Sequence, residues 1–84
     1  MALYLIDKPY GQNGLDLARL DPEAHIVLLQ DGVYLDPGGL ANVYALEEDA
    51  LKRGVAARLP ASVRLIGYGD LVDLIVAHKV VNFA

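Results

Sequence analysis

Short apolar runs, each followed by a polar or glycine-rich break, recur along the whole chain. The runs over 2–6 and 25–30 have no polar face, which is typical of strands buried on both sides in a parallel sheet. The runs over 42–46 and 63–68 are two further candidate strands. A last apolar segment, 80–83, is short enough to form only a closing strand. The pattern therefore predicts a sheet of four or five strands.

A first helix is predicted between the first two of these strands. The segment 15–20 has helical spacing, and Asn13 is a candidate N-cap. Leu15 and Ala18 fall on the inward face, and the spacing allows Leu20 to face inward as well. Glycines before this segment indicate that the chain leaves the first strand through a loop.

The clearest helix signal covers residues 47–54. Its first turn is acidic, which favours the positive end of the helix dipole, and Gly54 is placed to end it. Oppositely charged residues also stand four apart in the favourable order: Glu48 with Lys52, and Asp49 with Arg53.

The remaining connections complete the predicted architecture. About a dozen residues separate 25–30 from 42–46, which leaves room for a helical turn at 32–35 but not for a full crossover helix. Asp70 is a candidate cap for a last helix over 71–78. This order of elements predicts one α/β domain over residues 1–84, with three layers and a mainly parallel sheet of four to five strands.

The composition changes this picture by pointing to a partner. A domain of 84 residues has a thin core, yet 55% of the residues are hydrophobic. Either the core is unusually rich or part of the apolar surface faces another protein, and we favour the second interpretation. The net charge of −4 and the scattered Lys and Arg residues argue against a nucleic-acid partner and against an anionic membrane surface.

The chain also lacks the segments that would direct it to or across a membrane. Asp7 and Lys8 interrupt the first apolar run, so no signal peptide is expected. No apolar stretch approaches the roughly 20 residues that a spanning helix needs. We expect a soluble, cytoplasmic protein.

Cysteine is absent from the sequence. Disulfides, thiolate metal sites and cysteine nucleophiles are therefore excluded. His25 and His78 stand far apart in the chain and show no metal-ligand spacing, so we expect no metal and no cofactor.

Asp31 is the first candidate for chemistry, because it follows a buried strand at the edge of the sheet where ligands usually bind. It is either a catalytic or interface carboxylate, or a cap whose side chain holds the turn at 32–35. No neighbouring residue in the sequence supplies the partner that acid–base catalysis needs, which favours the structural or interface role. The loop "GQNG" at 11–14 lacks the known phosphate-loop patterns and is expected to be an ordinary loop.

The histidines and tyrosines offer further candidates. His78 falls on the apolar stripe of the last predicted helix, where it either complements the helix C-terminus or acts as a general base. His25 opens a strand and is expected at the surface. Tyr10 and Tyr34 lie in predicted loops, where an aromatic ring with a polar tip suits either an interface or ordinary loop packing. Two tyrosines are expected in the core: Tyr4 and Tyr44.

Four stretches, taken together and in this order, resemble the DsrH/TusB family. They are "LYLIDKPYGQNGLDLARL", "IVLLQDGVY", "VYALEEDALKRGV" and "VRLIGYGDLVDLIVAHKVV", and they cover nearly the whole chain. The resemblance implies a DsrE/DsrF/DsrH-like fold and assembly with DsrE-like (TusD) and DsrF-like (TusC) subunits into a hexameric sulfur-relay complex. Such complexes act in thiolation of the tRNA wobble uridine or in dissimilatory sulfur oxidation, and the persulfide is carried by the DsrE-like subunit.

The sequence departs from this family in two places. The segment 33–41 is short and contains Pro-Gly-Gly where relatives have room for a helix. The first helix reads "GLDLARL", without the cysteine that some DsrH members carry there. A role as sulfur carrier therefore cannot transfer to this chain.

Three functions remain open at this point. The first is a non-catalytic subunit of a sulfur-relay complex, most consistent with tRNA 2-thiolation. The second is a small enzyme or ligand-binding module that uses Asp31 and His78. The third is a standalone homo-oligomer of the same fold. The residues expected at an interface are Tyr10, Gln30, Asp31, Gly32, Tyr34, Val72, Val76 and His78.

Overall fold

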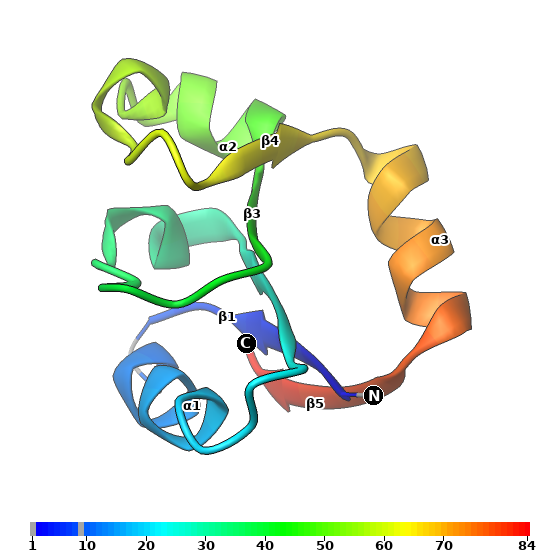
Figure 1. Ribbon diagram of the computed structural model, residues 1–84. Coiled ribbons are helices and arrows are strands. Elements are labelled where there is room, and N and C mark those ends of the chain that lie inside the picture. Colours follow the sequence, from blue (N-terminus) through cyan, green and yellow to red (C-terminus); the bar gives the residue numbers. More distant parts are fainter. Residues whose placement is uncertain (1, 9) are drawn as a thin grey trace.

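A computed structural model describes residues 2–8 and 10–84 and shows a five-stranded, all-parallel sheet between two layers of helix (Figure 1). The strand order is β4-β3-β2-β1-β5. This confirms the predicted three-layer α/β domain. In chain order the elements are β1 Ala2–Ile6, α1 Gly11–Ala18, β2 His25–Leu28, the 3-10 helix η1 Gln30–Tyr34, β3 Val43–Leu46, α2 Glu47–Lys52, the 3-10 helix η2 Ala56–Arg58, β4 Arg64–Ile66, α3 Tyr68–Ala77 and β5 Lys79–Phe83.

The two faces of the sheet are covered unequally. Figure 1 shows α1 and α2 on one side of the strands and α3 alone on the other side. The connection through α3 runs from β4, at one edge of the sheet, to β5, at the opposite edge. Because it crosses the whole sheet, α3 is the one helix in the described part of the chain that covers this second face.

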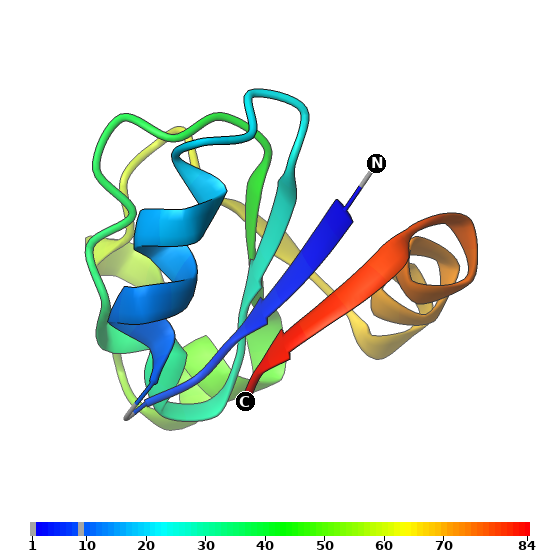
Figure 2. The ribbon, with the colours of Figure 1, turned by 90° about the horizontal axis from the view of Figure 1, so that it is seen from below.

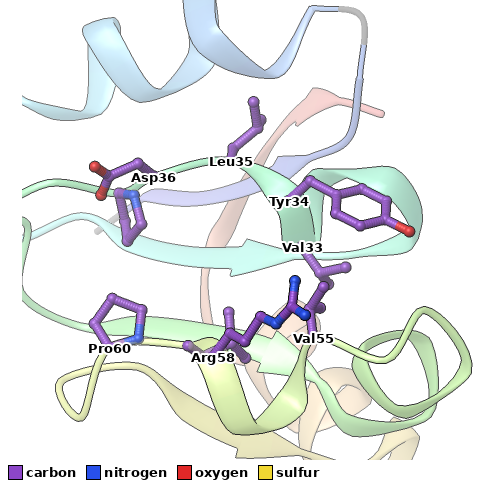
Figure 3. A pocket seen from close by; sticks show the side chains of 9 residues that line it. Val33, Tyr34, Leu35, Asp36, Val55, Arg58 and Pro60 are labelled. Atoms are coloured by element: carbon purple, nitrogen blue, oxygen red, sulfur yellow. The ribbon is translucent and has the colours of Figure 1, made fainter.

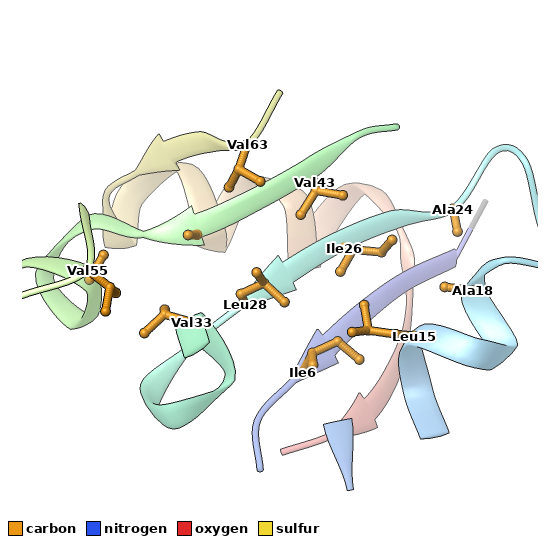
Figure 4. Packing of buried hydrophobic residues seen from close by; sticks show 12 residues of the cluster. Ile6, Leu15, Ala18, Ala24, Ile26, Leu28, Val33, Val43, Val55 and Val63 are labelled. Carbon is orange, nitrogen blue, oxygen red and sulfur yellow. The ribbon is translucent and has the colours of Figure 1, made fainter. Parts of the chain in front are cut away.

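The larger hydrophobic core lies on the first face, under α1, η1 and α2 (Figure 4). Alternate residues of each strand point into it, as the two-residue period of a strand requires. Ile26 and Leu28 of β2 are completely buried there, together with Leu15 of α1. The smaller core, on the second face, consists of Leu3, Val27, Leu29, Leu46, Ile66 and Leu71.

Helix α1 begins at Gly11, four residues before the predicted start, and Asn13 is not its N-cap. The N-cap is Tyr10, which makes no side-chain capping bond. The glycines expected to break the chain instead lie inside the helix and are buried: a Cβ on Gly14 would collide with the side chains of Ile6 and Phe83. They allow the helix to lie directly on the sheet.

The other helix boundaries are closer to the sequence prediction. Helix α2 ends as expected, with Gly54 at a positive φ of 69° just after the C-cap. Helix α3 begins at Tyr68, so Asp70 is its third residue and not its N-cap. The Asp70 carboxylate still stabilises the first turn, because Gly67 N donates to it at 3.2 Å. The short helix η2 was not predicted from the sequence.

Candidate functional site

Three loops meet at the carboxyl edge of the sheet, where acidic side chains accept hydrogen bonds from the backbone. Gln30 N donates to Asp49 Oδ2 at 2.7 Å, and Gly32 N donates to Asp7 Oδ1 at 3.2 Å. Gln30 has a positive φ of 50°, a backbone conformation that residues other than glycine rarely adopt. The carboxylate of Asp49, buried at 8% exposure, thus fixes a strained turn just after β2.

Asp31 lies beside this turn but does not cap it. Its carboxylate is largely exposed and accepts a hydrogen bond from Arg53 Nε at 2.9 Å, which raises the pKa of the guanidinium. The same guanidinium lies 3.6 Å from Asp49 Oδ1. The expectation that Asp31 caps residues 32–35 is therefore wrong, and the capping carboxylates are those of Asp7 and Asp49. The sequence could indicate Asp49 only as a first-turn acid of α2.

Gly32 is placed where no side chain fits. A Cβ at this position would fall on the carbonyl oxygen of Ile6, at the end of β1. The "QDG" segment therefore packs backbone against backbone across the carboxyl edge. This close approach accounts for the glycine without assigning it a ligand.

A groove opens beside η1 on the first face (Figure 3). Its volume is about 440 Å³, and it lies between the loop that follows η1 and the segment around η2. Val33 and Val55 form an apolar floor, while Arg58 and Asp36 supply charge at the rim. The short connection between β2 and β3 supplies η1 and its loop on one side of the groove, and the segment around η2 supplies the other side. Tyr34 borders the groove, and Lys8 Nζ lies 5.4 Å from its ring centre.

Helix α3 turns an apolar face to solvent. Val76 is 81% exposed and Val72 is 56% exposed, and both lie on the side away from Leu71, which is buried. The chain after α3 does not cover them, because β5 pairs with β1 instead (Figure 2). Tyr68 and Ile75 add partly exposed apolar surface to the same helix. We call Tyr68, Val72, Ile75 and Val76 the α3 face.

His25 and His78 lie in contact at the opposite, amino-terminal edge of the sheet. Their ring centres are 4.5 Å apart. His78 Nδ1 donates to the Leu74 carbonyl at 2.8 Å, which confirms that this side chain complements the end of α3. His25 is half-buried and not simply at the surface, as its place at the start of a strand suggested. The sequence gave no signal for this contact, since the two residues come from distant segments.

The structure separates the residues that an enzymatic site would need together. Asp31 follows the carboxyl end of β2, whereas His78 precedes the amino end of β5, so they cannot act on one substrate. In the described residues, no three His, Cys, Asp or Glu side chains are grouped to bind a metal ion. No helix of residues 2–8 and 10–84 is long and apolar enough to span a membrane.

Residues 9–81 match the family model described as "DsrH like protein". The chain belongs to the DsrH/TusB family. Among curated family members, a "Protein TusB" of Yersinia enterocolitica is 34% identical over 82 residues, which cover 84% of this chain and 86% of the relative. A "Protein TusB" of Pectobacterium carotovorum is 38% identical over 72 residues, which cover 74% of this chain and 76% of the relative.

The fold is also found in a solved structure. The crystal structure of the ychN protein from E. coli superimposes with a TM-score of 0.74 at 20% identity and covers 98% of this chain and 97% of its own. At this identity the likeness shows the fold alone. The family resemblance in the four sequence stretches and the predicted α/β fold are thus both confirmed.

Proposed function

We propose that this chain is a non-catalytic subunit of a cytoplasmic sulfur-relay complex that acts in 2-thiolation of the tRNA wobble uridine. The observation that carries the proposal is that this member of the family has no cysteine in its 84 residues. Transfer of persulfide sulfur needs a thiolate nucleophile, which this chain cannot supply. Its acids at the carboxyl edge also hold backbone amides and Arg53, which suits a structural role.

The α3 face supports assembly with other subunits. Exposed branched apolar side chains on one helix are unusual in a small monomer and mark a surface that a partner covers. We propose that this face contacts a TusC-like or TusD-like subunit. Tyr10 and Tyr34, which are 64% and 50% exposed, are candidates for a second contact near the carboxyl edge, with Gln30, Asp31 and Gly32.

Co-purification tests this assembly. The chain would be co-expressed with TusC-like and TusD-like proteins from the same genome and isolated through a tag on one partner. We expect Val76→Glu to reduce its recovery strongly, because a buried carboxylate without a partner is unfavourable in an interface. Leu20→Glu is a matched control, since Leu20 is also 81% exposed but lies beyond α1 on the other side of the sheet.

The control separates a specific interface from a general effect of charge. Full recovery of Val76→Glu, with a folded circular-dichroism spectrum, would contradict the role of the α3 face. Failure of the wild-type chain to bind either partner would contradict the complex itself. The tRNA role is tested separately by deleting the gene and measuring 2-thiouridine in total tRNA by mass spectrometry; unchanged 2-thiouridine would favour sulfur oxidation.

A further inference from the structure

The two histidines of this chain meet where α3 ends and β5 begins. We propose that His25 and His78 form an acid-sensitive contact that joins the C-terminal end of α3 to the sheet and weakens when His25 takes up a proton. The inference stands on the contact itself and does not depend on the proposed function. It concerns a conformational property of the domain that the sulfur-relay role does not require.

The geometry ties one ring to the helix and the other to the sheet. His78 is bonded to Leu74 through Nδ1, so its ring is fixed against the last turn of α3. His25 stands at the start of β2 on the second face, where its Nδ1 lies 3.4 Å from the Tyr44 hydroxyl of β3. The two rings are tilted by 54° and touch across the seam between helix and strands. Their separation therefore sets how closely the end of α3 approaches the sheet.

The groups around the pair do not compensate a positive charge on His25. No carboxylate among the described residues lies within ion-pair distance of either imidazole. The ring of Tyr44 packs beside His25 with ring centres 6.0 Å apart. A groove along Tyr44 and Leu74 holds charged groups of both signs, namely Arg64 of β4 with Asp70 and Asp73 of α3, and Lys79 directly follows His78 in the chain.

The direction of the effect follows from the state of His25. Burial lowers the pKa of His25 from its usual 6.5, and the neighbouring His78 lowers it further. The unfolded or locally opened chain therefore binds more protons than the closed state between the usual pKa and the lowered one. The contact is fully effective at a pH above about 6.5 and is lost as the pH falls through the lowered pKa.

Opening of the contact between His25 and His78 would change the position of the α3 face relative to the sheet. Helix α3 has one buried residue, Leu71, in its first turns, so its C-terminal half depends on the contacts near Leu74 and His78. Loss of the histidine contact would free the last turn and the start of β5, while β1 to β4 remain paired. The α3 face would then be displaced from the sheet at acidic pH.

Hydrogen exchange measures this opening in the intact chain. Backbone amides of the last turn of α3 and the first residues of β5 would be followed at about pH 7.5, 6.5 and 5.5, with correction for the intrinsic exchange rate. We expect the opening equilibrium constant to rise by up to about tenfold per pH unit below about 6.5 for each extra proton bound. Amides of β2 and β3 provide the internal reference and should change less.

Three variants test whether the pH dependence of this opening comes from the two histidines. His25→Gln should remove most of the pH dependence over this range, whereas His78→Gln should reduce it only in part, because the burial of His25 remains. Tyr44→Phe removes the hydroxyl beside His25 but keeps both imidazoles, so it should retain the dependence. An unchanged pH dependence in His25→Gln, or its loss in Tyr44→Phe, would overturn the proposal.

A second measurement keeps the test decisive if a glutamine variant does not fold. The ring protons of His25 and His78 would be titrated in the wild-type chain by NMR. We expect the His25 midpoint to fall below 6.5 and the amide signals at the end of α3 to shift in the same step. An ordinary His25 midpoint without shifts in α3 would overturn the inference.

Discussion

Two acids, Asp31 and Asp49, stand close together at the carboxyl edge but differ in what they hold. Asp31 is exposed and pairs with the side chain of Arg53, whereas Asp49 is buried and accepts from Gln30 N in a strained turn. Exposed ion pairs contribute little to stability, while an unpaired buried amide is costly. We therefore expect Asp49, which is distant in sequence, to stabilise the "QDG" segment more than Asp31 does.

Replacing Asp49 tests this difference. We expect Asp49→Ala to lower the free energy of unfolding by about 1–3 kcal/mol, because Gln30 N loses its acceptor. Asp31→Asn should lower it less and should leave the recovery of partner subunits unchanged. Urea unfolding of both variants gives the comparison. An Asp31→Asn variant that is folded and assembled but inactive in sulfur transfer would restore a direct role for this carboxylate.

Gly32 allows a second test at the scale of one residue. We expect Gly32→Ala to destabilise the domain by about 1–3 kcal/mol or more, because the added Cβ meets the Ile6 carbonyl oxygen. Gly39→Ala is the matched control, since a Cβ there meets nothing within 4 Å. Thermal unfolding should show a clear loss for the first variant only. Equal melting temperatures would show that the edge relaxes around a methyl group.

The strands and helices differed in how well the sequence predicted them. β1, β3 and β5 lie where the apolar runs are, because a strand buried on both faces needs an uninterrupted run. The start of α1 was missed because its buried glycines serve close packing, which a single sequence does not distinguish from a loop. Leu20, which the spacing allowed to face inward, is exposed because α1 ends before it.

The candidate site was predictable only in part, for a related reason. The exposed stripe of Val72 and Val76 follows directly from helical spacing. The bonds from Asp7 and Asp49, and the contact of His25 with His78, join residues from distant segments. Such contacts depend on strand order, and neighbours along the sequence do not encode it.

Helix α3 gives a prediction at the scale of an element. Leu71 is the one buried residue of α3, so Leu71→Ala should lower the free energy of unfolding by about 2–5 kcal/mol. Val76→Ala, on the exposed side of the same helix, should change the free energy of unfolding of the isolated chain by less than about 0.5 kcal/mol. Denaturant unfolding measures both. A large cost for Val76→Ala in a monomer would place that side chain in the core instead.

At the scale of the whole molecule, the two faces of the sheet differ in how much apolar surface they leave exposed. The first face holds the larger core, while the second face is closed by α3 alone, and the outer side of that helix remains apolar. Part of the 55% hydrophobic content therefore lies on an exposed surface of α3, which we expect a partner to cover.

The isolated chain should consequently associate with itself. Burying an apolar side chain contributes about 1.5–3 kcal/mol, so a few residues of the α3 face suffice to favour a dimer at high micromolar concentration. Light scattering should give a mass above that of the 9.1 kDa monomer for the wild type and close to it for Val76→Glu. A monomeric wild type that also binds no partner would contradict this expectation.

The lack of a thiol gives a chemical prediction for the whole chain. Incubation with a cysteine desulfurase and cysteine, followed by intact-mass analysis, should add no sulfur atom to this protein. A TusD-like partner treated in the same tube is the positive control. A stable sulfur adduct on this chain would contradict the assignment of a non-carrier role.

The pairing of β1 with β5 also bears on how the protein is made. Tyr4 and Leu5 align with Val81 and Asn82, so β1 pairs with a strand that is synthesised much later, after all the other strands of the sheet (Figure 2). Until then β1 has an open edge, which is a template for pairing with other chains. Such distant pairing also slows folding. Nascent chains of this protein are therefore expected to need shielding on the ribosome, and stalled or truncated products that lack β5 should be the ones that aggregate.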